Sequence, residues 1–291
     1  MSKKRIYLAP MVGRTDQHFR AFVRILSKNI YLYTEMITCD TLLYADRKPS
    51  VIHDSEHPIT IQLAGSDPKK FSQCSKIIEE QGFNEINLNI GCPSSKVVKG
   101  KFGACLMNFP EQVADIVTEV KNSCSLPLSI KTRLGLGLDE DLDLLRNFIR
   151  CTSEAGCKNY FIHARNAILN GISPKKNRKI PPLRYEDVFK IKKEFPNLTI
   201  VLNGGITTVS EIKNNLNFVD GVMIGRKIYD DPMFILNIEN EIFNSNLLFN
   251  KKEILERYAV YIQEQMKLGV KKYLLLKHLF GLYYKTNLSK K

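Results

Sequence analysis

Eight short apolar runs, alternating with stretches of helical period, limit this chain to few folds. The runs lie at residues 6–10, 30–34, 59–63, 85–90, 126–131, 160–163, 198–203 and 219–225. Clear helical patterns lie between some of them, at residues 71–81, 111–121 and 139–155, the last with acids in its first turn. Eight strand–helix units in about 240 residues favour a (β/α)₈ TIM barrel. A doubly wound open sheet is the alternative, weakened because no G-x-G-x-x-G follows the first strand.

The pattern changes after about residue 243. Ile254, Leu255, Tyr258, Ile262 and Met266 recur at helical spacing and predict one amphipathic helix. A second is expected from residue 270 towards residue 284, with a basic side. We therefore predict a barrel at residues 1–242 and a small C-terminal helical domain at residues 243–291. The alternative is that these are the last helices of the barrel.

The predicted strand ends carry polar and glycine residues that are unusual in a core. In a barrel of parallel strands the C-terminal ends share one face, which we call the mouth, and active sites form there. The candidates are Pro10, Met11 and Val12; Gln62; Asn89 and Cys92; Lys131 and Arg133; His163 and Arg165; Asn203, Gly204 and Gly205; and Gly225 and Arg226.

The last two strand ends resemble the phosphate site that barrels form after strands seven and eight. Gly204, Gly205 and Gly225 allow backbone N–H groups to approach an anion, and Arg226 adds a charge-assisted contact. Gln62, Lys131 and His163 are then placed to contact a planar polar ring. One phosphate and one broad ring fit flavin mononucleotide (FMN) better than a dinucleotide, and a lysine would stabilise the reduced, anionic ring.

The composition of the chain indicates which kind of partner it binds and in which cellular compartment it works. Lys and Arg number 43 against 30 Asp and Glu, a net charge of +13, which favours a polyanionic partner such as nucleic acid. Seven cysteines without a CxxC or a zinc-spaced cluster indicate no disulfide framework and no metal site. A cytoplasmic protein without a membrane span is expected.

The loop after the sixth strand is a candidate RNA contact. It carries Lys175, Lys176, Arg178 and Lys179 beside the predicted mouth, where they can contact phosphates. Lys175 and Arg178 are the candidates nearest the substrate. Arg178 is preferred because its guanidinium is forked.

Three motifs carry a family resemblance. They are NIGCP at residues 89–93, FGACLM at residues 102–107, and a long irregular segment from His163-Ala164-Arg165 to Pro182-Leu183. With these the chain resembles the tRNA-dihydrouridine synthases, most closely the DusA-like branch, over nearly the whole barrel.

The resemblance implies the roles of the site residues. It implies that FMN is held by Pro10, Met11, Val12, Gln62, Lys131, His163, Asn203, Gly204, Gly205, Gly225 and Arg226. Cys92 is similar to the family's proton donor, and Asn89 to the residue that contacts the target uridine. NADPH would reduce the flavin, a uridine of the tRNA D-loop would be tipped out of its stack, and Cys92 would protonate carbon 5. Positions 20 and 20a are the expected targets.

Other interpretations stay open at this point. Lys131 and Arg133 could support the uracil carbonyls or the flavin, and Arg165 could also face the substrate. Cys105, expected to be buried, is the rival acid. A flavin barrel acting on a free pyrimidine, similar to dihydroorotate dehydrogenases, and a non-catalytic tRNA-binding protein are the alternative functions. The chain ends earlier than its relatives, so its tRNA-contacting domain is expected to be shortened. A monomer is expected.

Overall fold

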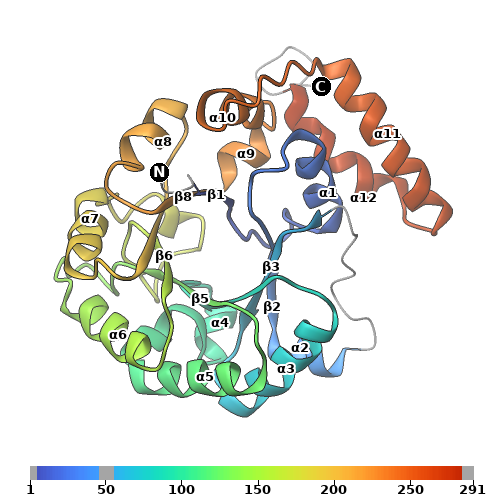
Figure 1. Cartoon of the computed structure of the whole chain (residues 1–291). Coiled ribbons are helices and arrows are strands. Elements are labelled where there is room, and N and C mark those ends of the chain that lie inside the picture. Colours follow the sequence, from blue (N-terminus) through green and yellow to red (C-terminus); the bar gives the residue numbers. More distant parts are fainter. Residues whose placement is uncertain (1–4, 46–55, 284–291) are drawn as a thin grey trace.

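The computed structural model describes residues 5–45 and 56–283, and its centre is a closed barrel of eight parallel strands (Figure 1). The strands pair in the order β1-β8-β7-β6-β5-β4-β3-β2. A parallel bridge between Tyr7 and Tyr31 joins the two ends of this order, and Leu8 N donates to Tyr31 O at 2.9 Å. The strands are β1 (Arg5–Leu8), β2 (Leu32–Thr38), β3 (Ile59–Ala64), β4 (Glu85–Ile90), β5 (Leu128–Arg133), β6 (Asn159–His163), β7 (Thr199–Asn203) and β8 (Gly221–Ile224).

Helices surround the strands, as Figure 1 shows. The α-helices are α1 (Gln17–Leu26), α2 (Cys39–Tyr44), α3 (Pro68–Glu80), α4 (Ser95–Lys99), α5 (Pro110–Ser123), α6 (Asp143–Glu154), α7 (Tyr185–Glu194), α8 (Val209–Asn215), α9 (Arg226–Asp230), α10 (Phe234–Ile242), α11 (Lys251–Lys267) and α12 (Lys272–Leu276). The 3₁₀ helices are η2 (Gly103–Asn108), η3 (Lys176–Arg178) and η4 (Lys277–Tyr283). The predicted (β/α)₈ barrel is confirmed, and the open sheet is excluded because the strand order closes on itself.

Two apolar clusters hold the barrel together. The larger one fills the space between the strands and the outer helices. A smaller one, inside the barrel, contains Tyr7, Tyr33, Phe161, Val201 and Met223. The rings of Tyr7 and Phe161 meet edge to face with their centroids 4.8 Å apart. This aromatic layer fills the barrel interior, so the polar side chains beyond it form a mouth and not a pore.

The C-terminal helices share the main apolar cluster of the barrel. Ile254, Tyr258 and Leu275 are fully buried in the same cluster as Phe19 and Phe22 of α1. The Tyr258 and Phe22 ring centroids lie 4.9 Å apart. The domain boundary at residue 243 therefore stays a prediction, and residues 284–291, where a shortened tail was expected, lie outside the described residues.

Two helix predictions need correction. The helix expected at residues 139–155 begins at Asp143, because the side chains of Asp139 and Asp141 accept the N–H groups two residues on and hold that segment as turns. The second C-terminal helix is broken, since α12 ends at Leu276 and the chain continues as η4. Within η4, a Cβ added at Gly281 would lie 2.6 Å from Pro232 Cδ, so this segment packs closely against the chain before α10.

One acidic side chain ties the C-terminal segment to the barrel. Asp16 caps α1 by accepting from Phe19 N at 3.0 Å. Its two carboxylate oxygens also lie 2.6 Å from Lys277 Nζ and 2.8 Å from His278 Nε2. Burial alone would raise the pKa of Asp16, but the contacts with His278 and Lys277 hold it below its ordinary value.

We predict that Asp16→Ala destabilises the protein by about 3 kcal/mol, because it removes a cap and leaves the buried His278 without its carboxylate. Asp67→Ala is the control, since Asp67 caps α3 at the surface and should cost about 1 kcal/mol. Urea unfolding measures both. The depressed pKa means that the Asp16 contribution is present at neutral pH and shrinks as the pH falls below about 4. An equal loss in the free energy of unfolding of the two variants would show that Asp16 does not hold the C-terminal segment to the barrel.

Candidate active site at the barrel mouth

The pairing register brings the predicted polar side chains together. Asn89 pairs with Lys131, Arg133 pairs with His163, and His163 pairs with Asn203. Because side chains alternate along a strand, these residues all face the inside of the barrel. Four neighbouring strands therefore contribute to one polar layer at their C-terminal ends.

Side-chain amides organise the turn that carries Cys92. Asn89 Oδ1 accepts from Gly91 N at 3.2 Å and from Cys92 N at 3.0 Å. Asn89 Nδ2 donates to Gln62 Oε1 at 2.9 Å. The Asn89 side chain therefore holds this turn, and Gln62 of β3 holds the Asn89 side chain.

The carbonyl of Cys92 is held by the loop that leads into η2. Ala104 N donates to Cys92 O at 3.0 Å. Gly103 has a φ of +72°, and a Cβ there would lie 2.7 Å from Cys92 O, so only glycine allows this approach. Cys92 itself is half-buried and lies close enough to Lys131 and Arg133 to act on the pKa of both. The structure thus brings the thiol to the mouth, where the sequence predicted it.

Burial at the mouth lowers the pKa values of Lys131 and His163. Lys131 Nζ donates to Asn203 Oδ1 at 3.0 Å, and Asn203 Nδ2 donates to Met223 O at 2.8 Å. Burial and then the charge of Arg133 lower the pKa of Lys131 to about 7. Burial, followed by Arg133 and Lys131, lowers the pKa of His163 well below its ordinary value, so its imidazole is neutral at pH 7.

Glycines at the ends of β7 and β8 let neighbouring side chains approach closely. A Cβ on Gly204, whose φ is +123°, would lie 2.8 Å from His163 Cδ2. At Gly225 it would meet Ala9 Cβ and Met11 Sδ at 3.3 and 3.2 Å. The loop after β1 therefore lies against the end of β8, as closure of the barrel requires.

Positive charge gathers at the mouth without compensation. Lys131, Arg133, Arg165, Arg178 and Arg226 form no salt bridge among the described residues, and burial leads the causes that lower the pKa of the first four. The charges of these residues then lower one another's pKa. An anionic ligand would relieve this repulsion. The mouth is therefore built to receive negative charge.

Arg133 is buried, with only 5% of its surface exposed, and its guanidinium is engaged with the backbone. Its Nε donates to Gly91 O at 3.1 Å, and one terminal nitrogen donates to Asn166 O and Asn177 O at 3.3 and 3.4 Å. The side chain thus joins the turn of Cys92 to the loop after β6. A direct contact of Arg133 with substrate stays a prediction.

The loop after β6 is ordered by a buried asparagine. Asn177 exchanges two hydrogen bonds of 2.8 Å with the backbone of Ile168, which pins η3 under the mouth. Arg178 is half-buried and lies near Arg226 and Cys92, whereas Lys175 is exposed. Arg165 donates to the carbonyls of Lys179 and Pro181. The loop therefore brings Arg178 towards the thiol and leaves Lys175 at the rim.

Sequence reasoning missed some supporting residues and misjudged one thiol. Tyr185, whose hydroxyl donates to Gly204 O, holds the glycine turn after β7, and no strand-end signal marks it. Asn177 was part of a recognised motif but was not assigned a role. Cys105, expected to be buried, is half-buried, and its thiol donates to Phe102 O at 3.1 Å.

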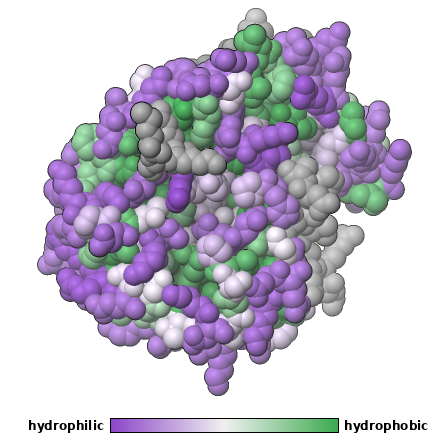
Figure 2. Space-filling view, viewed as in Figure 1, coloured by the Kyte–Doolittle hydropathy of each residue, from purple (hydrophilic) through white to green (hydrophobic). Residues whose placement is uncertain are grey.

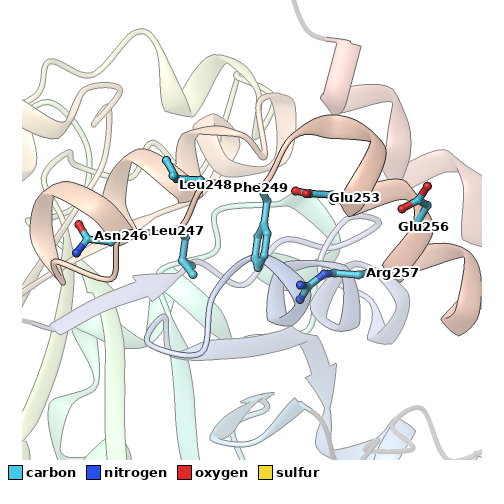
Figure 3. Close-up of a pocket in the computed structure, with 7 residues that line it drawn as sticks. All are labelled: Asn246, Leu247, Leu248, Phe249, Glu253, Glu256 and Arg257. Atoms are coloured by element: carbon cyan, nitrogen blue, oxygen red, sulfur yellow. The ribbon is translucent and has the colours of Figure 1, made fainter.

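One cavity lies beside the mouth, and another lies apart from it. One, of about 420 Å³, lies beside the mouth, where Val12, Thr34, Glu35 and Met36 are among its lining residues. The other, of about 530 Å³, lies between the segment before α11 and α11 itself, and none of its lining residues ends a strand (Figure 3). In that cavity the Arg257 guanidinium lies 4.1 Å from the Phe249 ring centroid. This second cavity does not belong to the mouth.

Large apolar patches, metal sites and membrane-spanning helices would point to other kinds of function. Hydrophilic residues predominate on the face shown in Figure 2, with apolar residues in smaller patches between them. In residues 5–45 and 56–283, no group of three or more His, Cys, Asp or Glu side chains could hold a metal ion. No helix within these same ranges is long and apolar enough to span a membrane.

Comparison with known proteins decides the family. The model of the dihydrouridine synthase (Dus) family matches residues 7–291. The chain belongs to this family. The predicted resemblance to this family is therefore confirmed.

Named relatives agree with this assignment. A tRNA-dihydrouridine(20/20a) synthase of Synechocystis sp. is 41% identical over 278 residues, covering 95% of this chain and 83% of that protein. The proteins of the same name from Vibrio parahaemolyticus and Pseudomonas putida are 41% and 42% identical over 281 residues, 96% of this chain and 86% and 84% of theirs. Histamine dehydrogenase from Rhizobium sp. 4-9 shares the fold, with a TM-score of 0.59, 13% identity, and coverage of 82% of this chain and 46% of that chain.

We predict that Arg133→Met loosens the loop after β6, because three backbone carbonyls lose a charged donor. Trypsin should then cleave at Lys175 to Lys179 about tenfold faster or more, since local opening becomes easier. Arg146→Met, which removes exposed ion pairs on α6, is the matched control and should leave this rate unchanged. Identical cleavage of the two variants would show that Arg133 does not restrain the loop.

Proposed function

We propose that this protein reduces uridine to 5,6-dihydrouridine in the D-loop of tRNA, with FMN as cofactor and NADPH as reductant. The observation that carries the proposal is the placement of Cys92 on an ordered turn beside Lys131, in a mouth of uncompensated positive charge. Family membership and the printed names of the relatives support uridine in tRNA, and uridines 20 and 20a, as the substrate.

The residues present fit FMN. Gly204, Gly205 and Gly225 carry no side chain that would keep a phosphate from their backbone, and the exposed Arg226 can pair with the phosphate. Gln62, Lys131, His163 and Asn203 offer amide, ammonium and imidazole groups to a polar ring, and Pro10, Met11 and Val12 border it. Once reduced, bound flavin supplies the hydride equivalent that carbon 6 of the uracil accepts.

Cys92 completes the reduction as general acid. Its thiol gives a proton to carbon 5, which turns the 5,6 double bond into a single bond and leaves a thiolate that solvent reprotonates. Asn89 is proposed to contact the uracil, since it is half-buried and its side chain holds the same turn. Cys105 is the weaker candidate, because burial raises its pKa and its thiol already donates to Phe102 O.

The tRNA is proposed to lie across the mouth. Arg178 and Lys175 are placed for its phosphates, one beside Cys92 and one at the rim, and Arg165 borders the same loop. Arg133 is proposed to act on the substrate through the loop that it holds. The C-terminal helices extend the basic surface. A cytoplasmic monomer is the form proposed to act.

The experiment that tests the function has two parts. The absorption spectrum of purified protein should show a bound flavin, and tRNA from cells lacking the protein should lose dihydrouridine at positions 20 and 20a. Colourless protein that FMN does not restore, or unchanged dihydrouridine in such cells, would overturn the proposal. Turnover of a free pyrimidine without tRNA would support the dehydrogenase-like alternative.

We predict that Cys92→Ala lowers the rate of uridine reduction by about 10²–10⁴-fold, the usual contribution of a positioned acid. Flavin should stay bound and reducible by NADPH, because Cys92 is not among the proposed cofactor contacts. Cys105→Ala is the control and should keep most of the activity. Uridine reduction by Cys92→Ala at the wild-type rate would remove the assignment.

We predict that Lys131→Met lowers the midpoint potential of the bound flavin by about 30 mV or more, because a cation beside the ring stabilises its reduced form. Because the pKa of Lys131 is about 7, reduction above pH 7 takes up an extra proton at this lysine. The wild-type potential should then fall more steeply with pH than that of Lys131→Met. Lys267→Met, an exposed lysine on α11, should behave as the wild type. Parallel pH profiles would contradict the role of Lys131.

A further inference from the structure

A continuous chain of hydrogen bonds runs down the inside of the barrel from the mouth. Asn89 Nδ2 donates to Gln62 Oε1 at 2.9 Å, and Gln62 Nε2 donates to Asn87 Oδ1 at 2.8 Å. Asn87 Nδ2 then donates to Ser129 Oγ at 2.8 Å, and the Ser129 hydroxyl donates to Glu85. The three middle residues are at most 1% exposed. These buried polar groups are therefore hydrogen-bonded to one another and not to solvent.

The direction of the chain is set at its upper end. The N–H groups of Gly91 and Cys92 can only donate, so Asn89 Oδ1 must accept from them. Asn89 must then donate onward with Nδ2, which requires Gln62 to accept with Oε1 and to donate with Nε2. Asn87 is oriented by the same reasoning. Reversing one buried amide would set donor against donor, which is costly without water.

Glu85 is a suitable end for such a chain. The last donor, the Ser129 hydroxyl, needs an acceptor, and a carboxyl group offers one in either protonation state. Burial raises the pKa of Glu85 to about 7, although Ser129, Arg5 and Thr60 act against the rise. Both forms of the carboxyl are therefore accessible near neutral pH, and both close the chain.

We propose that Asn87 is a positioning residue of the reaction, which fixes the orientation of the Gln62 amide and, through it, the side chain of Asn89. This role rests on the proposed function, because Gln62 is assigned to the cofactor and Asn89 to the uridine. Asn87 is fully buried and does not line the mouth, so it acts only through its neighbours. Glu85 and Ser129 anchor it from below.

The test compares Asn87→Leu with Asn215→Leu. Leucine has a similar volume but can neither accept from Gln62 nor donate to Ser129. Asn215 is a buried asparagine on the outer helix α8, where its Nδ2 donates to Glu211 O at 2.7 Å, so its replacement controls for general destabilisation. The measurements are the dissociation constant of FMN, the absorption spectrum of the bound flavin, and kcat and KM for tRNA.

Asn87→Leu should weaken FMN binding about tenfold through a misplaced Gln62. It should also lower kcat about tenfold or more, with KM for tRNA within about twofold, since small misplacements are costly in catalysis. Asn215→Leu should leave the FMN constant and kcat within about twofold of the wild type. Glu85→Gln, which keeps an acceptor oxygen for Ser129, should do the same.

Several outcomes would overturn the proposal. Asn87→Leu with wild-type FMN binding and kcat, or with losses equal to those of Asn215→Leu, would show that Asn87 has only a structural role. If Asn87→Leu does not fold, Ser129→Ala replaces it, because it removes the acceptor of Asn87 Nδ2 with a smaller change; an unaltered FMN constant would then contradict the chain. Wild-type protein that binds FMN but forms no dihydrouridine would instead count against the proposed function, while FMN binding by the variants still tests Asn87.

Discussion

The register of the parallel strands is the constraint on which the site depends. It sets Asn89 beside Lys131, and His163 between Arg133 and Asn203, so that side chains from β4 to β7 face one interior. A shift of one residue in any strand would turn its polar side chains into the apolar layer under the helices. The aromatic cluster around Tyr7 and Phe161 fills much of the barrel below them, and the buried hydrogen-bonded chain from Gln62 to Glu85 also lies inside the barrel.

The mouth gathers the candidate functional side chains, but it also buries positive charges close to one another, which is unfavourable. Burial, and then the charge of Arg133, lower the pKa of Lys131 to about 7, and no carboxylate among the described residues forms a salt bridge with either side chain. The fold compensates with backbone and amide contacts: Arg133 donates to three carbonyls, and Asn203 accepts from Lys131. Charge repulsion of this kind is typical of functional sites, where a bound ligand of opposite charge can relieve it.

Much of the fold was predictable because its signals are local. Each strand is a short apolar run ended by a polar, glycine or proline residue, and residues 85–90 were predicted with the bounds that β4 has. The start of α6 was not predictable from periodicity, since Asp139 and Asp141 favour turns through their own side chains. The change from α12 to η4 was not predicted either, and η4 lies so close to Pro232 at Gly281 that a side chain there would clash, a contact that no local pattern shows.

The sequence alone determined which residue types stand at the strand ends, and its three motifs, one of them around Cys92, were enough to indicate the family. Only the tertiary structure decided how they are used. It showed that Arg133 is engaged with three carbonyls, that Tyr185 holds the turn at Gly204, and that amides link Asn89 to Glu85. The physical reason is that a residue's type follows from local patterns, whereas its hydrogen-bond partners come from strands and loops distant in the chain.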